Sequence, residues 1–365
     1  GVTDYDDNAY QEAEYYFGDE NDGAMSIGWR EIALSDVADA EDEQPGDSYW
    51  DSDQVRWFYF KASGAKQTSS TNKTINGRKY GFDQYGRMIA DWHNNSLGAA
   101  TYQNASRRGS SNMYFSSPED GARFTKGWFK VVPGYYLNYA DYDNGTDRWY
   151  YADGNGNLYA GQIKTIKGKK YAFDLKGGMI YGLALLRTDG STIYEYADNE
   201  NKYDSQDKFM ETARNMSSDW AFYYFSDNED KDGSMKTGTQ KISLDGAKKG
   251  QGVTGMSEKK YYLGGMLLTA DADNKIEVVN KTTLEKITVS KLISDLGLTG
   301  VDASKKIGQA NKGDVIYTNT GVDTDGANLT ALTGNYVVVN VSGTVVKSGS
   351  KVDGDGFKVV LDGNN

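Results

Sequence analysis

One short pattern recurs three times in this chain and constrains its fold more than any other feature. Each copy has alternating aromatic residues, a turn containing Gly or Asp, and a methionine after the turn. The central tyrosines, Tyr80, Tyr171 and Tyr261, are 91 and 90 residues apart. Alternation on both sides of a turn predicts a β-hairpin, and the constant spacing predicts a structural repeat. The copies are Asn76–Trp92, Lys167–Gly182 and Glu258–Leu268.

Two other hairpin patterns recur around this one. The first has clustered tyrosines, then Gly-x-Met or glycine, then Gly-Trp, and it is expected at 13–29 and 113–128 and, with Thr239 in place of the tryptophan, at 222–239. The second contains Trp57 in one copy and Trp149 in the other. An isolated hairpin is marginally stable in water, so the hairpins are expected to stack on their aromatic faces. The predicted units are 13–92, 112–183 and a degenerate copy at 220–270.

The rest of the chain is predicted to hold an acidic lead-in at 1–12, an insertion at 184–219 and a β-rich C-terminal segment at 271–365. A short helix is expected near Ile32–Ala40, and a second one after an N-cap at Asp204, because Phe209, Met210, Ala213 and Met216 have helical spacing. The C-terminal segment is expected to contain a helical turn at Ser290–Leu296. Its strands are expected at Lys275–Val279, Val315–Thr318, Tyr336–Val341, Thr344–Ser348 and Phe357–Leu361.

Composition excludes several classes of protein. With Gly 43, Tyr 28 and Cys 0, the chain is mainly β, with tight turns and no disulfide or thiolate chemistry. The net charge of −12 arises in residues 1–54, which hold 17 acidic residues and one basic one, so nucleic acid is not an expected partner. No apolar run approaches the ~20 residues of a membrane span. The first residue is Gly1, and the chain stops within a strand pattern, so a removed export signal and a longer native protein are expected.

The residues that catalysis or metal binding would use are scarce. His93 is the only histidine, so neither a histidine triad nor a His-pair metal motif is supported, and the chain is not expected to be an enzyme. Three Asp/Asn-Gly runs, 228–233, 323–326 and 353–356, resemble the start of a calcium loop. The first has Thr239 where the twelfth-position glutamate should be, and turn chemistry explains all three. No cofactor is expected, with calcium as the alternative.

The ordered aromatic, Gly-x-Met and Gly-Trp motifs resemble the cell-wall-binding repeat superfamily, which includes choline-binding and glucan-binding repeats of Gram-positive surface proteins. The residues that carry the resemblance are Tyr15–Phe17, Gly23–Met25, Gly28–Trp29, Trp149–Tyr151, Gly156, Met88, Met179 and Met266. The resemblance implies a solenoid-like stack of hairpins, non-catalytic ligand sites between neighbouring hairpins, and a secreted or cell-wall location in a Gram-positive bacterium. The long insertions and Thr239 depart from the family pattern.

Aromatic rings can bind sugars by stacking on the apolar face of a pyranose. The same rings could also form the core between hairpins, since short hairpins have little else to bury. We expect Trp92 and Trp128 to be the most exposed; Trp92 has no aromatic counterpart, because Leu183 follows Met179 at that place. The candidate ligand-binding residues are Trp29, Trp57, Tyr59, Trp92, Trp128, Trp149, Tyr151 and Tyr171.

Three functions follow from these patterns. The preferred one is binding of an α-glucan such as starch or dextran, because an interrupted array suits a groove better than repeated small cages. The alternative is anchoring to choline-bearing teichoic acid of the cell wall, with cation–π binding of the quaternary ammonium. The third is a structural or adhesive spacer that binds a protein partner through the C-terminal segment.

Overall fold

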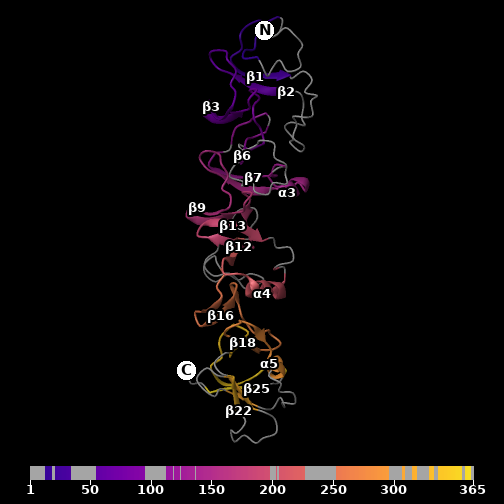
Figure 1. Ribbon diagram of the computed structural model, residues 1–365, viewed down its shortest axis with the longest axis vertical. Helices are drawn as coiled ribbons and strands as arrows, with labels where there is room; N and C mark the ends of the chain where they lie inside the picture. The colour runs from indigo at the N-terminus through magenta and orange to yellow at the C-terminus, as the bar shows by residue number, and fades with distance from the viewer. Residues whose placement is uncertain are drawn as a thin grey trace. The chain divides into compact units, whose positions relative to one another are not determined.

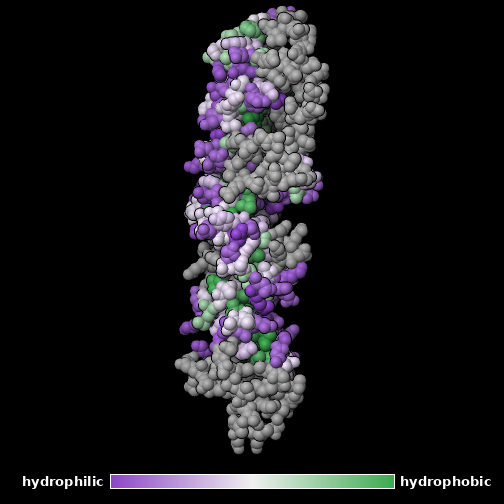
Figure 2. All heavy atoms as spheres, in the orientation of Figure 1, coloured by the Kyte–Doolittle hydropathy of each residue, from purple (hydrophilic) through white to green (hydrophobic). Residues whose placement is uncertain are grey.

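A computed structural model of the protein describes residues 13–18, 21–33, 55–94, 112–117, 119–123, 125–135, 137–197, 203, 205–226, 252–295, 306–308, 315–318, 329–332, 336–355 and 358–362. The chain divides into two units, 1–180 with 189–195, and 181–188 with 196–365. Each unit consists mainly of short antiparallel strands, as expected from the sequence (Figure 1). Among the residues that Figure 2 colours on the face it displays, hydrophobic ones form only small patches between hydrophilic ones.

The first unit is built from hairpins of short strands. The ladders are β1–β2, β3–β4, β5–β6, β7–β8 and β9–β10–β11. The element bounds are β1 Gly28–Ala33, β2 Val55–Phe60, β3 Ser70–Ile75, β4 Arg78–Phe82, β5 Trp92–Asn94, β6 Asn112–Tyr114, β7 Gly127–Val131, α3 Tyr139–Asp143, β8 Arg148–Ala152, β9 Gln162–Ile166, β10 Lys169–Phe173 and β11 Met179–Ile180. Strands β12 (Leu183–Asp189) and β13 (Thr192–Ala197) contribute residues to both units.

The repeated Tyr hairpin is a three-strand meander. The predicted strand at Tyr80 and the turn after it are confirmed as β4 and its following turn. However, Asn76-Gly77, predicted as the start of the hairpin, forms a separate tight turn that joins β4 to β3, with φ of 48° and 79°. Left-handed φ at both central residues is typical of the hairpin turns that Asn-Gly favours. The return segment is also shorter than expected, because Met88 makes a single bridge to Phe82 and Trp92 begins β5.

The turn after the aromatic strand is a five-residue motif that occurs four times. An Asp or Asn at its first position accepts hydrogen bonds through Oδ1 from the backbone N–H groups two and four residues later, at 2.8–3.0 Å. The fourth residue is always a glycine with positive φ. Side-chain acceptance from backbone N–H explains why Asp and Asn occupy this position. Among the described residues the four first positions are Asp83, Asp153, Asp174 and Asn340, so one copy of the turn lies in the C-terminal segment.

The principal ladders join patterns that the sequence places in different hairpins. Strand β1 pairs with β2 over six residues, with Trp29 opposite Tyr59. The predicted hairpin at 13–29 is reduced to one bridge, between Phe17 and Met25. A six-residue ladder satisfies far more backbone groups than a single bridge, so the longer connection is favoured. The helix expected near Ile32–Ala40 is wrong at its start, since Ile32 lies in β1, and its remainder, 34–40, lies outside the described residues.

The described residues of the second unit form two helices and several small sheets. Its further elements are α4 Gln206–Asn215, β14 Trp220–Tyr224, β15 Gly255–Ser257, β16 Lys260–Leu263, β17 Met266–Leu267, β18 Ile276–Asn280, β19 Lys286–Ile287, α5 Val289–Asp295, β20 Lys306–Gly308, β21 Val315–Thr318, β22 Leu329–Leu332, β23 Tyr336–Asn340, β24 Ser348–Val352 and β25 Lys358–Asp362. Strand β12 pairs with β14, and β18 with β19 and β23. A second sheet has the order β22–β21–β20–β25–β24, in which β20 and β25 are parallel.

Both helices expected in the second unit are present. Helix α4 buries Phe209, Met210 and Ala213 in the core, and Ser205 caps it, accepting a hydrogen bond from the Lys208 N–H at 3.4 Å. Asp204, the expected cap, lies outside the described residues. The predicted C-terminal strands correspond to β18, β21, β23 and β25, but the one at Thr344–Ser348 is wrong: Val345 makes only a bridge to Val339, and β24 begins at Ser348. The five-residue turn that begins at Asn340 ends at Thr344, where this strand was expected to start.

The repeated turn motif gives a test of stability. Burial raises the pKa of the Asp174 carboxyl, against the opposing effect of the Gly178 and Lys176 N–H groups and the charges of Arg148 and Lys176. Because the folded-state pKa lies above the ordinary 3.8, the folded protein loses stability as pH rises from 3.8 through the raised value. Asp174→Asn, which keeps the acceptor as Asn340 does, is therefore expected to be more stable than wild type at neutral pH. Each tenfold decrease in the acid dissociation constant of Asp174 in the folded state lowers the free energy of unfolding of the wild type at neutral pH by ~1.4 kcal/mol.

Urea unfolding across the acidic to neutral range measures this difference. The variant and wild type should converge in acid, where Asp174 is protonated in both the folded and the unfolded chain. Asp83→Asn is the matched control: its turn is the same, but Asp83 Oδ2 also accepts from Arg87 Nε at 2.6 Å, so the charge has a partner. A variant that is less stable than wild type at neutral pH would contradict the expectation.

Candidate functional site

Five aromatic residues from two successive hairpins form a compact group, here called cluster A. Its members are Trp29, Trp57, Tyr59, Tyr80 and Phe82. The two indoles lie nearly perpendicular, at 83° with ring centroids 6.4 Å apart. The Trp29 ring also lies 5.3 Å from Tyr59 and 4.9 Å from Tyr80, both edge to face. These are favourable geometries for aromatic pairs.

The same arrangement occurs a second time, here called cluster B. Its members are Trp128, Trp149, Tyr151, Tyr171 and Phe173. The two indoles lie at 85° with centroids 6.3 Å apart, and Trp128 lies 5.1 Å from Tyr151 and 4.9 Å from Tyr171. The centroid distances of the two clusters therefore agree within 0.2 Å. The repeat preserves a three-dimensional arrangement as well as a motif.

The register of the ladders explains how each cluster forms. Trp29 lies opposite Tyr59 in the β1–β2 ladder, and Trp57 lies two residues before Tyr59, so all three project from one face. Strand β4 of the next hairpin supplies the fourth ring, Tyr80. In cluster B, strands β7, β8 and β10 make the equivalent contacts. Each cluster is therefore assembled from neighbouring hairpins.

Burial differs within each cluster in the same way. Tyr80 and Tyr171 are buried, and Met88 and Met179 are buried beneath them. The four tryptophans are half-buried. The buried rings and methionines therefore form the packed base of each cluster, and the indoles form its solvent-facing part. This division accommodates both roles weighed from the sequence, a core between hairpins and a surface that can meet a ligand.

Cluster B has one ring more than cluster A. Tyr159 stacks on Tyr151 at 5.2 Å and 10°, and Lys164 Nζ lies 5.3 Å from the Tyr159 ring centroid. Burial raises the pKa of the Tyr159 hydroxyl above its ordinary value. In cluster A, Gln67 makes the backbone hydrogen bond that Tyr159 makes in cluster B, to Tyr59 instead of Tyr151. The two clusters thus share a core geometry and differ at one edge.

Trp92 lies apart from both clusters. Its ring packs against Tyr114, Phe129 and Tyr150, and its indole Nε1 donates to the Val132 carbonyl at 2.8 Å. It is half-buried, as the four cluster tryptophans are, so neither Trp92 nor Trp128 stands out from the others as the more exposed side chain that was expected. The structure brings seven of the eight candidate residues into the two clusters and places Trp92 in a packed group.

The third copy of the repeat has no such cluster among the described residues. Tyr261 packs into the core of the second unit with Phe209, Leu263 and Met266. Thr239, the position that lacks tryptophan, lies outside the described residues. Three cluster members were absent from the sequence-based candidates: Tyr80, Phe82 and Phe173. The repeat spacing could have identified Tyr80, because Tyr80 is the counterpart of the candidate Tyr171.

In the described part of the chain, no group of three or more His, Asp or Glu side chains is arranged to hold a metal ion. The runs 228–233 and 323–326 lie outside it, so calcium remains a prediction. His93 packs edge to face on Phe115, with centroids 6.2 Å apart. The described helices all fall short of the length and hydropathy that a bilayer span requires.

No protein-family model and no curated protein matches the chain. Similar solved structures include three from Streptococcus pneumoniae. CbpJ is 17% identical over 94% of this chain and 89% of its own, with a TM-score of 0.37. Choline-binding protein F is 17% identical over 91% and 89%, with a TM-score of 0.34. The modular autolysin LytC is 15% identical over 73% of this chain, which spans only 44% of LytC, with a TM-score of 0.31.

These neighbours include choline-binding proteins, the superfamily that the sequence motifs resemble. The class of molecule that the geometry defines is a β-hairpin repeat protein with two equivalent aromatic clusters.

Proposed function

We propose that this chain is a non-catalytic cell-wall-binding protein of a Gram-positive bacterial surface. Clusters A and B each bind a quaternary ammonium group carried by a wall polymer, such as choline on teichoic acid. The observation that supports this proposal is the repeated pair of perpendicular indoles with a tyrosine beside them, at nearly the same centroid distances in both clusters.

The chemistry of such a site follows from the charge distribution of aromatic rings. The face of each ring carries partial negative charge, and a cation within ~6 Å of a ring centroid gains ~2 kcal/mol when it is desolvated. Perpendicular indoles present their faces in two directions, so a round cation can be approached from more than one side. A trimethylammonium group forms no hydrogen bonds and is weakly hydrated, which suits a site lined by Trp29, Trp57 and Tyr80 and based on Met88.

The α-glucan expected from the sequence is the second candidate ligand. That expectation rested on an interrupted array, whereas each cluster is complete within two neighbouring hairpins. One observation favours a sugar at cluster B: the Trp149 indole Nε1 is buried and donates to no group among the described residues. A sugar hydroxyl could accept this hydrogen bond if the side chains that cover Nε1 moved aside, whereas a trimethylammonium group has no acceptor for it. The protein partner expected at the C-terminal segment remains a prediction.

Titration with choline chloride tests the proposed function. Isothermal calorimetry on the intact chain is expected to show two sites per chain, one for each cluster. Ethanolamine is the matched control, because its primary ammonium is more strongly hydrated and should bind much more weakly. Affinity electrophoresis in starch and in dextran addresses the second candidate. Absence of saturable choline binding, with retardation in either glucan, would replace the first ligand by the second.

A further inference from the structure

The connection between β7 and β8 carries a tyrosine group that belongs to neither cluster. Its described residues, 132–135 and 137–147, form a loop, here called the tyrosine loop, with a short helix, α3, beside the end of β7 (Figure 1). Helix α3 buries none of its side chains, so it adds little to a hydrophobic core. Three tyrosines nevertheless gather here. Tyr135 packs edge to face on Tyr139 at 5.1 Å and on Tyr142 at 5.5 Å.

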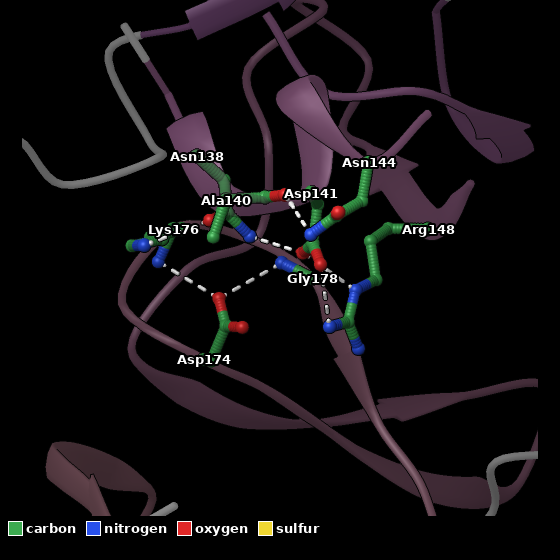
Figure 3. A network of polar contacts seen from close by, with 8 residues as sticks. All are labelled: Asn138, Ala140, Asp141, Asn144, Arg148, Asp174, Lys176 and Gly178. Atoms are coloured by element: carbon green, nitrogen blue, oxygen red, sulfur yellow. Dashed lines mark hydrogen bonds and ion pairs between the residues drawn. The ribbon is translucent and has the colours of Figure 1, made fainter. Parts of the chain in front are cut away.

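Polar contacts fix this loop to the body of the unit (Figure 3). Arg148 of β8 donates from Nε and Nη2 to the two oxygens of Asp141, at 2.8 and 3.0 Å. Asn138 donates to Asp141 through Nδ2, and its Oδ1 accepts from Lys176 Nζ at 2.9 Å. A paired, hydrogen-bonded arginine–carboxylate contact is geometrically specific. The loop is therefore held at the N-cap and at the middle of α3.

Apolar contacts fix the other side of the loop. Leu137 is buried with Phe129 and Tyr150, and Trp92 packs against the same group. The Trp92 indole donates to the Val132 carbonyl, and a Cβ on Gly134 would lie only 3.0 Å from Trp92, so glycine is needed for the close approach. Trp92 thus packs against the tyrosine loop and hydrogen-bonds to its backbone.

The outer surface of the loop combines a ring with hydrogen-bond acceptors. Tyr139 leaves 43% of its surface exposed, a large fraction for a ring that also packs on Tyr135. Asp143 and Asn144 are exposed beside it on the helix. Asp143 Oδ2 and Asn144 Oδ1 accept no hydrogen bond from the described residues, while Asn144 Nδ2 donates to the Ala140 carbonyl at 2.8 Å and is thereby oriented. No Lys or Arg occurs between 132 and 147.

We propose that the Tyr135, Tyr139 and Tyr142 group is a second binding site, for a neutral hexopyranose unit of a glycan. The Tyr139 ring stacks on the apolar face of the sugar, and Asp143 and Asn144 accept hydrogen bonds from its hydroxyls. A rigid ring on an immobilised loop loses little conformational entropy on binding. The exposed acceptor oxygens of Asp143 and Asn144 match a ligand rich in hydroxyl donors, and the Asp143 carboxylate disfavours an anionic polymer, while Arg148 and Lys176 are already paired with Asp141 and Asn138. This site is independent of clusters A and B.

Calorimetric titration of the intact chain with maltoheptaose, cellohexaose and chitohexaose tests this site. At least one of the three is expected to bind saturably, and choline should not displace it. Tyr139→Ala is expected to weaken that binding at least tenfold, and Tyr139→Phe, which keeps the ring, should retain most of it. Tyr194→Ala is the matched control, because Tyr194 of β13 is equally exposed, at 44%, and lies outside the loop.

Three outcomes would overturn this second site: no saturable binding of any of the three oligosaccharides, unchanged binding in Tyr139→Ala, or displacement of the bound oligosaccharide by choline. The first two outcomes can be measured whether or not choline binds, and the third would place the oligosaccharide at a choline site instead of the tyrosine loop. Failure at the tyrosine loop is therefore distinguishable from failure at the clusters. Circular dichroism and choline binding by the Tyr139→Ala chain report whether the variant is folded.

Discussion

Trp128→Ala is expected to halve the choline-binding capacity of the chain, because one of its two clusters loses the ring that contacts all the others. Trp128 lies within 6.3 Å of Trp149, Tyr151, Tyr171 and Phe173 by ring centroids. Removing it takes away one cation–π partner directly and leaves Trp149 without its perpendicular neighbour. The loss of ~2 kcal/mol for each desolvated cation–π contact corresponds to about thirtyfold in affinity or more.

Cluster A serves as the internal control for this experiment. In the Trp128→Ala chain it should bind choline with wild-type affinity, which shows that the hairpins are still folded. Trp29→Ala should produce the mirror result, with cluster B intact. Trp220→Phe, in β14 of the second unit, should leave both sites unchanged. If Trp128→Ala binds two equivalents of choline, cluster B is part of the core only, and the proposed function fails at that cluster.

The existence of the clusters could be predicted from the sequence to a large extent. The spacing of Tyr80 and Tyr171 identified equivalent strands, and the Trp57 and Trp149 pair has nearly the same offset. Alternation within a strand places residues two apart on one face, which groups Trp57 with Tyr59. These relations are local, and seven of the eight candidate residues chosen from them lie in cluster A or cluster B.

Which strands pair with each other was harder to predict from the sequence. The sequence suggested that each aromatic segment pairs with the next one across a short turn. In the structure, β1 pairs with β2 across residues 34–54, and β7 pairs with β8 across the tyrosine loop. Closure of a longer loop costs little extra entropy, so a ladder of five or six residue pairs outweighs a nearby turn. Periodicity within one segment contains no information about which distant segment completes the ladder.

The tyrosine loop could not be recognised for a related reason. Helix α3 has five residues and buries none of them, so no hydrophobic period indicates a helix. Its anchors come from Arg148, Lys176 and Trp92, which the chain places in three different hairpins. The sequence singled out Trp92 as the tryptophan without a counterpart, but its contact partner, Val132, is 40 residues away. In the structure, Trp92 packs against this loop.

Trp92→Ala is expected to destabilise the first unit by ~3 kcal/mol, because it opens a cavity in a packed aromatic group. The lost ring contacts are with Tyr114, Phe129 and Tyr150, at centroid distances of 5.1, 6.2 and 5.0 Å. The substitution also removes the only indole donor to the Val132 carbonyl among the described residues. The tyrosine loop should then loosen, and oligosaccharide binding at Tyr139 should weaken as a secondary effect.

Urea unfolding followed by fluorescence measures the change, and Trp92→Phe provides the matched control. Phenylalanine keeps most of the ring packing and loses only the N–H donor, so its cost should be nearer ~1 kcal/mol. The direct role expected from the sequence makes a different prediction: if the Trp92 ring itself stacks on a sugar, Trp92→Ala should lose oligosaccharide binding while its free energy of unfolding stays unchanged. If Trp92 holds the tyrosine loop in place, Trp92→Ala lowers the free energy of unfolding together with oligosaccharide binding. If Trp92 contacts the sugar, only binding falls, so the two measurements together assign Trp92 to one role.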